Sequence, residues 1–379
     1  MRSITSIADL RELAKKRVPR VLFEYADNGS YDEITLRRNR RDLDNISLRQ
    51  RVCVDVSSQS LKTSLLGQQV SMPLAIAPTG LTGMFRRNGE VLGARAAMSS
   101  GIPFCLSTMS ICSIEGLRDR VNAPFWFQLY LMRDRGFTHE LIARAKAAAC
   151  SVLVLTLDLQ VIALRRQEVR RGLTIPPRIT FSNVLDVVSR PAWVAGLLFG
   201  KRRTFGNLIG GTPGTGSVAS LAQWISMQCD PSVSWSDVEW VRSLWPGKLV
   251  LKGILDPDDA KRACAVGADA IVVSNHGGRQ LDGAPSSISV LGRVVDAADT
   301  KCEVLFDGGI QSGKDIFKAL AYGARGCLIG KAYIYGMAAL GEKGVKLAIS
   351  IMRQELAVTM ALSGVSDVTR IGRSVLIEN

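Results

Sequence analysis

One histidine of the chain stands where it could do acid–base chemistry. His276 lies in the stretch SNHGGRQLD, residues 274–282, directly after an apolar run. Imidazole titrates near neutral pH, so it can accept a proton from a substrate and pass it on. The two glycines that follow, Gly277 and Gly278, permit a sharp turn that would expose the ring. Arg279 could then hold an anionic substrate, whereas a purely structural histidine in a glycine-rich turn is the alternative.

Polar side chains also stand at the ends of other apolar runs. Asp158 ends one run and Arg165 follows it seven residues later, Gln128 and Tyr130 end another run, and Thr79 follows a third. In a barrel of parallel strands the carboxyl ends of all strands meet at one face, and active sites are built there. We therefore expect these side chains to share one site with His276.

A lysine and two glycine-containing turns point to a bound cofactor. Lys252 lies inside an apolar run. An unpaired ammonium group would be costly there, so Lys252 needs an anionic or carbonyl partner. Two later runs end in Asp-Gly-Gly at 307–309 and in Gly-Lys at 330–331. Backbone N–H groups at such turns often bind phosphate in this corner of a barrel, so a phosphate site is expected there.

Eight short apolar runs, alternating with helical patterns, must position these groups. The runs are continuous rather than alternating, which is typical of parallel strands buried on both faces. They cover Pro73–Pro78, Pro103–Ser107, Phe125–Leu129, Val152–Asp158, Lys248–Gly253, Ala270–Asn275, Glu303–Gly308 and Gly326–Gly330. Eight strand–helix units predict an α/β fold, a (β/α)8 TIM barrel. A doubly wound sheet is the second choice, since no G-x-G-x-x-G turn follows the first strand.

Helical spacing of Ala, Leu, Arg and Lys predicts helices between the strands. Examples are Thr138–Ala149, Pro257–Val266 and Gly313–Tyr322, and Asp256 followed by proline is a good helix start. Residues 1–23 alternate charge with Leu and Ile, which predicts an N-terminal amphipathic helical segment rather than a secretory signal.

A long insertion after the fourth predicted strand breaks this rhythm. It covers residues 172–235, and connections of this length are usually functional. Its middle, Ala192–Gly200, is apolar, and Lys201–Arg203 follows at once. An apolar patch beside three cations is typical of a monotopic membrane contact. A loop that buries these residues, or a contact between subunits, is the alternative.

Composition and charge limit the class of protein. The chain has 379 residues, of which 47% are hydrophobic and 22% charged, so disordered and collagen-like chains are excluded. We expect one barrel domain over residues 1–379. The formal net charge is +14, but Lys and Arg are scattered and no basic motif is interleaved with aromatic residues. We therefore expect no nucleic-acid partner, and a surface that favours anionic lipids and substrates.

The eight cysteines predict neither a zinc site nor a thioredoxin-type site. None of them forms a C-x-x-C pair, and most lie in apolar surroundings. We expect buried, reduced thiols and no bound metal.

Taken together, these motifs resemble the FMN-dependent L-2-hydroxy-acid dehydrogenase and oxidase family. The resemblance rests on residues 274–282, on Lys252-Gly253-Ile254 and on the Asp-Gly-Gly turn, and it runs from Ile7 to about Asp367. It is greatest to the bacterial membrane-associated L-lactate and L-mandelate dehydrogenases, which carry a partly apolar, membrane-docking insertion after the fourth strand.

The resemblance implies catalytic and substrate-binding roles. His276 would take the proton of the substrate alcohol while electrons pass to the flavin, and Asp158 would hydrogen-bond His276 and stabilise its cation. Tyr130 would contact the substrate hydroxyl or carboxylate. The substrate carboxylate would be bound by Arg279, Tyr25 and Arg165, because a guanidinium fork suits a planar carboxylate.

The resemblance also implies how FMN is bound. Lys252 would face N1 and O2 of the flavin, where a fixed positive charge favours the anionic reduced form. The ring and ribityl chain would be lined by Pro78, Thr79, Gly80, Ser107, Gln128, Thr156 and Ser274. The ribityl and phosphate end would be surrounded by Asp307, Gly309, Gln311, Gly330 and Lys331.

Some positions depart from the family pattern. Relatives usually have arginine where this chain has Gln311 and Lys331, so we expect weaker retention of the FMN phosphate. The segment after Asp158 is altered as well, which leaves either Arg165 or Arg166 as the arginine that faces the substrate.

The resemblance implies oxidation of a lactate- or mandelate-type L-2-hydroxy acid, with electrons passed to a membrane quinone or a cytochrome. The protein would be peripheral at the cytoplasmic face of the inner membrane, and a homo-oligomer, by resemblance a tetramer. A soluble oxidase that reduces O2 to hydrogen peroxide is the alternative. A non-redox barrel enzyme would leave His276, Arg279 and Asp158 unexplained, and an inactive scaffold would be motivated only by Gln311 and Lys331.

Overall fold

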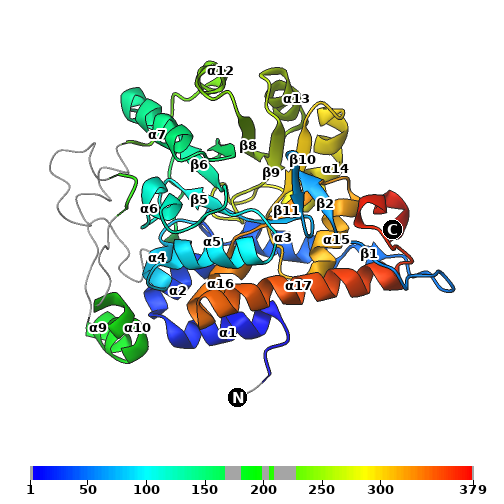
Figure 1. Ribbon diagram of the computed structural model, residues 1–379, viewed down its shortest axis with the longest axis horizontal. Coiled ribbons are helices and arrows are strands. Elements are labelled where there is room, and N and C mark those ends of the chain that lie inside the picture. Colours follow the sequence, from blue (N-terminus) through cyan, green and yellow to red (C-terminus); the bar gives the residue numbers. More distant parts are fainter. Residues whose placement is uncertain (1–2, 167–180, 199–204, 209–227, 378–379) are drawn as a thin grey trace.

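The computed structural model describes residues 3–166, 181–198, 205–208 and 228–377. Eight parallel strands form the central sheet (Figure 1). They are β4 Leu74–Ile76, β5 Cys105–Ser107, β6 Trp126–Tyr130, β7 Val152–Thr156, β8 Lys248–Ile254, β9 Ala270–Val273, β10 Glu303–Phe306 and β11 Gly326–Ile329. Each of the eight predicted strands is therefore present.

The sheet curls into a nearly closed barrel. Its strand order is β4-β11-β10-β9-β8-β7-β6-β5, and a parallel bridge between Ile76 and Phe104 joins the two outer strands. Side chains along the strands alternate between two buried clusters. Val154, Val250 and Leu305 belong to the cluster with Ala75 and Leu328, whereas their neighbours in sequence pack in the larger cluster. Burial on both faces explains the continuous apolar runs and confirms the predicted (β/α)8 barrel.

Helices follow the strands and surround the barrel (Figure 1). They are α4 Thr82–Phe85, α5 Gly89–Ser99, α6 Ile114–Arg118, α7 Arg135–Ala147, α12 Trp235–Leu244, α13 Pro257–Ala265, α14 Ser287–Ala298, α15 Gly313–Ala321, α16 Lys331–Leu340 and α17 Glu342–Leu362. Helix α13 begins as predicted, since the Asp256 side chain accepts the N–H of Asp258 and proline occupies the first turn.

The chain begins with three helices before the barrel, α1 Ile7–Arg17, α2 Arg20–Asp27 and α3 Ile34–Asp44. Helix α1 lies along α16 and buries Ile7, Leu10 and Ala14, as its amphipathic pattern predicts. A hairpin of β2 Thr63–Leu65 and β3 Gln68–Val70 adds Leu65 and Val70 to the inner barrel cluster. The short pair β1 Ser47–Leu48 and β12 Leu376–Ile377, with the 3-10 turns Val368–Arg370 and Arg373–Val375, completes the C-terminal end.

In its described part, the insertion contributes the helices α9 Phe181–Val188 and α10 Pro191–Leu198, which lie at the side of the barrel near α1 and α2 (Figure 1). Asp186 of α9 accepts the N–H of Arg20, and the indole N–H of Trp193 in α10 donates to the Met84 carbonyl oxygen at 2.8 Å. The basic residues Lys201–Arg203 lie outside the described residues. No helix in the described part of the chain is long and apolar enough to cross a membrane.

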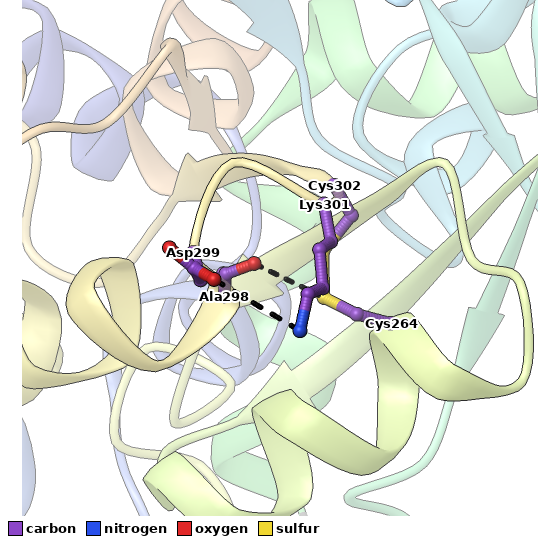
Figure 2. The surroundings of a disulfide bond; sticks show 5 residues. All are labelled: Cys264, Ala298, Asp299, Lys301 and Cys302. Atoms are coloured by element: carbon purple, nitrogen blue, oxygen red, sulfur yellow. Dashed lines mark hydrogen bonds and ion pairs between the residues drawn. A yellow bond between two sulfur atoms is a disulfide. The ribbon is translucent and has the colours of Figure 1, made fainter.

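Two cysteines form a disulfide, which corrects the prediction of reduced thiols. Cys264 near the end of α13 bonds to Cys302, which precedes β10, and their Cα atoms are 5.8 Å apart (Figure 2). The two are 38 residues apart in sequence, and the packing of α13 against α14 brings them together. No sequence spacing encodes that contact. Cys105, Cys150 and Cys327 are buried free thiols, as expected.

Candidate functional site

A cavity of about 290 Å³ opens at the carboxyl ends of the barrel strands, and we call it the barrel cavity. All eight strands, or the turns that follow them, contribute to its wall. The predicted site residues that line it are Tyr25, Pro78, Thr79, Gly80, Ser107, Tyr130, Thr156, Arg165, Lys252, His276, Arg279, Asp307, Gly309, Gln311, Gly330 and Lys331. Gln128, Asp158 and Ser274 lie behind this wall and contact its members.

His276 and Asp158 form a hydrogen-bonded pair at the mouth of the barrel. The Nδ1 atom of His276 is 2.9 Å from an Asp158 carboxylate oxygen. Burial alone would raise the pKa of Asp158, but the charge and hydrogen bond of His276, with the charge of Lys252, outweigh burial and lower it. Asp158 is therefore an anion that fixes the imidazole and stabilises its protonated form. Nε2 is the ring nitrogen left for a substrate.

Local backbone geometry exposes the imidazole. His276 has a φ of 58°, in the left-handed region, and Gly277 and Gly278 follow with φ of 65° and 74°. A Cβ atom on Gly278 would lie 2.5 Å from the backbone nitrogen of Leu36, so only glycine fits there. Gly253 leaves room for the Asp158 side chain, because a Cβ atom on Gly253 would lie 2.7 Å from the Cβ of Asp158.

Lys252 is buried and has a protein partner. Its ammonium group lies 2.8 Å from an Asp307 carboxylate oxygen and donates to the Ser274 hydroxyl at 2.6 Å. Burial lowers the pKa of Lys252, but the charges of Asp307 and Asp158 raise this pKa by more than burial lowers it. Lys252 therefore stays charged. The anionic partner that the sequence required is thus Asp307, which holds the charged Lys252 side chain at the cavity wall.

Three buried polar atoms around the cavity have no hydrogen-bond partner among the described residues. They are Gln128 Nε2, Thr156 Oγ1 and Asp307 Oδ1, and behind the wall the same holds for Asp158 Oδ2. A buried donor or acceptor left without a partner costs about 1–3 kcal/mol. Gln128 is positioned by a bond that its amide oxygen accepts from Ser107 at 3.0 Å. Such positioned but unsatisfied atoms indicate a polar ligand that completes them.

Arginine and tyrosine side chains make an anion-binding wall. Arg279 donates to the carbonyl oxygens of Tyr25, at 2.5 Å, and Asn28, at 2.9 Å, and its guanidinium lies 4.9 Å from the centre of the Tyr25 ring. Arg165 lines the cavity, whereas Arg166 pairs with Asp32 at the exposed surface. The structure thus places Arg165, and not Arg166, in the cavity.

Tyr130 also lines the cavity, within reach of the charges of Asp158, Arg165 and Arg279. Desolvation, and next the charge of Asp158, raise the pKa of Tyr130. Its hydroxyl therefore keeps its proton at neutral pH and can donate to a substrate oxygen.

The far end of the cavity holds a cation that the sequence analysis did not single out. Arg40 of α3 lines the cavity beside Gly309 and Gln311. Its guanidinium donates to the Gly309 carbonyl oxygen at 2.5 Å and to Asp315 at 2.7 Å. Arg40 is one of four arginines among the five residues 37–41 of α3, so no spacing distinguishes it.

Lys331 is the second cation at that end. It donates to the Asp27 carbonyl oxygen at 2.5 Å. Desolvation and the charge of Arg279 lower the pKa of Lys331 to about 7. The neutral Gln311 adds no charge to this corner of the cavity, so Arg40 and Lys331 supply it.

Comparisons with known proteins agree with this geometry. The family described as FMN-dependent dehydrogenase matches residues 14–378. The chain is 46% identical over 379 residues to an L-lactate dehydrogenase of Caulobacter vibrioides, covering 99% of this chain and 98% of that one. Its fold is similar to the crystal structure of the monotopic membrane protein (S)-mandelate dehydrogenase, with a TM-score of 0.95, 37% identity and full coverage of both chains. A soluble mutant of the membrane-associated (S)-mandelate dehydrogenase from Pseudomonas putida has a TM-score of 0.85, 36% identity and the same coverage.

Proposed function

Because this chain belongs to the FMN-dependent dehydrogenase family, we propose that it oxidises an L-2-hydroxy acid of the lactate or mandelate type to the 2-oxo acid. The single observation that supports this best is the His276–Asp158 pair in the same cavity wall as Arg279. A base and a fixed cation in one cavity suit a substrate that carries a hydroxyl group beside a carboxylate.

The residues around the barrel cavity fit FMN. Gln128 Nε2 and Thr156 Oγ1 are unsatisfied and suit the polar edge of a flavin ring, and Asp307 Oδ1 suits a ribityl hydroxyl. Ring and ribityl contacts would come from Pro78, Thr79, Gly80 and Ser107, and Lys252, which donates to Ser274 behind the wall, would supply positive charge. The phosphate end would be held by Gly309, Gln311, Gly330, Lys331 and Arg40. When bound, FMN accepts the two electrons that the oxidation releases.

The chain's own residues bind the substrate and move its proton. Arg279, with Tyr25 and Arg165, holds the carboxylate, which leaves the hydroxyl facing His276. Nε2 of His276 accepts the hydroxyl proton, because Nδ1 is held by Asp158. Asp158 then stabilises the imidazolium, and Tyr130 donates a hydrogen bond to the substrate oxygen.

We further infer that the acceptor is a membrane quinone or a cytochrome and that the protein is peripheral at the cytoplasmic face of the inner membrane. The support is the similarity to a monotopic membrane protein and the exposed apolar side chains of α9. Leu185 is 55% exposed and Val188 is 67% exposed, which is unusual for two apolar residues within one turn.

The direct test is anaerobic bleaching of the bound flavin by a panel of L-2-hydroxy acids from glycolate to mandelate. We expect L-lactate or L-mandelate to bleach the yellow protein fully. If no acid of the panel does so, the proposed oxidation is wrong. Reoxidation in air separates the acceptors, since rapid release of hydrogen peroxide would identify an oxidase instead.

Membrane attachment through α9 predicts a loss of binding on charge insertion. We expect Leu185→Asp with Val188→Asp to release the protein from vesicles that contain anionic lipid, because two carboxylates replace apolar side chains at the contact. Sedimentation with vesicles measures the bound fraction. The matched control is Val358→Asp with Leu362→Asp, two exposed residues of α17, which should stay bound. Equal release of both variants, or a wild type that never sediments, would contradict the attachment.

FMN binding is expected to weaken as the pH rises above 7. The pKa of Lys331 is about 7 in the protein without FMN, and the negative charge of a bound phosphate group would raise this pKa. Binding is therefore strongest below pH 7, where the ammonium is already charged, and weakens toward the pKa of the complex, by at most about tenfold per pH unit. Fluorescence titration of FMN with apoprotein between pH 7 and pH 9 measures this.

Two variants check the assignment of that pH dependence. Lys331→Met should make FMN affinity nearly independent of pH over this window. Arg40→Gln should weaken binding equally at each pH and keep the slope, because a guanidinium does not titrate there. A slope that survives in Lys331→Met would show that another group titrates.

A further inference from the structure

A second cavity lies beside the barrel cavity, and one aromatic side chain lines both. This side cavity has a volume of about 670 Å³ and is bounded by the α4–α5 segment, α6, α10 and α16. Phe85, the last residue of α4, is 2% exposed and belongs to both linings. The Phe85 side chain therefore stands between the barrel cavity, where the flavin is expected, and the side cavity.

Helix α10 of the insertion forms one wall of the side cavity. Trp193 faces the cavity and is anchored by its bond to the Met84 carbonyl oxygen, one residue before Phe85. Gly196 also lines the cavity, and a Cβ atom on it would have no neighbour within 4 Å. The helix α9 packs on α10 and carries the exposed Leu185 and Val188. The apolar surface of the insertion therefore adjoins the wall of this cavity.

The lining of the side cavity combines buried apolar residues with a charged rim, in which four arginines outnumber the acids Glu115 and Asp119. Glu90 also lines the cavity, and its buried carboxylate accepts the N–H groups of Gly83 and Ile111. Ile111 and Ala338 are buried apolar residues of the wall. Arg86 and Arg87 line it as exposed cations. Such a lining suits a flat, apolar ring that carries polar oxygens, because the interior contacts the ring and the arginines donate to the oxygens.

We propose that the side cavity binds the ring of a membrane quinone, which is the electron acceptor. This rests on the proposed oxidation of a 2-hydroxy acid. In the net reaction the substrate loses the hydrogens of its C–H and O–H bonds and gains a C=O bond, while the quinone gains two electrons and two protons and becomes a quinol. Atoms and electrons balance without a further reactant. A lipid headgroup explains the arginines but not why Phe85 is shared with the redox cavity.

The test places a large side chain in the side cavity at Gly196, where a Cβ atom would have no neighbour within 4 Å. In Gly196→Phe we expect the KM for ubiquinone-1 to rise at least tenfold, while the rate of anaerobic flavin bleaching by the hydroxy acid stays unchanged. Turnover with ferricyanide, a small water-soluble acceptor, should also be unchanged. The matched control is Ala195→Phe, the adjacent and exposed position of α10 that lies outside the lining, and it should leave all three measurements as in the wild type.

A second readout does not depend on turnover. Ubiquinone-1 should quench tryptophan fluorescence saturably in the wild type, and this quenching should be lost in Trp193→Phe, which a thermal melt shows to be folded. An unchanged KM in Gly196→Phe, or quenching that persists in Trp193→Phe, overturns the proposal. Loss of vesicle binding with an unchanged KM assigns the cavity to lipid and overturns it too. If no hydroxy acid bleaches the wild type, the proposed function fails, and Trp193-dependent quenching still supports the quinone site.

Discussion

His276→Gln is expected to slow flavin reduction by the hydroxy acid by about 10²–10⁴-fold, the usual contribution of a positioned general base. Glutamine can keep a hydrogen bond to Asp158, but its amide cannot accept and hold the substrate proton. The residues that would hold FMN are untouched, so the flavin should remain bound. Anaerobic stopped-flow absorbance of the flavin measures the rate, and the absorbance spectrum of the resting protein gives the FMN content.

Two further variants separate chemistry from folding. His276 has a φ of 58°, and asparagine tolerates this backbone better than glutamine does. His276→Asn should therefore be equally inactive and at least as stable. His139→Gln is the matched control, since His139 is exposed on α7 and should react as the wild type does. A His276→Gln rate above about a hundredth of the wild-type rate would remove His276 from the role of base.

The barrel was predictable because its signal is local. A strand buried on both faces must be apolar at each position, and such a run is visible in five to seven residues, as in Val152–Thr156. The same apolar runs also show where the strands end. Polar residues that follow the runs, such as His276 and Asp307, could therefore be assigned to the barrel mouth, and both line the cavity. Helix α13 was equally visible, because its capping aspartate and proline are adjacent in sequence.

Features that depend on packing between distant segments were not predictable. Arg40 reaches the Gly309 turn only because α3 packs beside the barrel mouth. The sequence of α3 contains several arginines, and nothing in it distinguishes the one that makes this contact. The Cys264–Cys302 bond depends on the contact of α13 with α14. Lys252 combines a feature that the sequence predicts with one that it does not. The apolar residues around Lys252 in the sequence required an anionic partner. Only the fold shows that this partner is Asp307, which follows β10, two strands away from β8 in the barrel.

Lys252→Met is expected to lower the free energy of unfolding by about 3–5 kcal/mol, because it leaves the Asp307 carboxylate buried without its cation. Both side chains are largely buried, at 5% and 11% exposure, so water does little to replace the lost partner. Urea unfolding of the apoprotein, followed by circular dichroism, measures the loss. The control is Lys261→Met, which breaks an exposed pair with Asp258 and should change stability by no more than about 1 kcal/mol.

The cause of that loss can be separated from the loss of a long side chain. If the unpaired carboxylate is responsible, adding Asp307→Leu to Lys252→Met should restore most of the stability, since no buried charge then lacks a partner. If packing of the lysine stem were responsible instead, the double variant would be less stable than either single variant. The double variant should nevertheless bind FMN poorly, because it lacks both the cation of Lys252 and the Asp307 oxygen that has no partner among the described residues. Recovered stability with lost FMN binding would show that this pair is retained for the cofactor rather than for the fold.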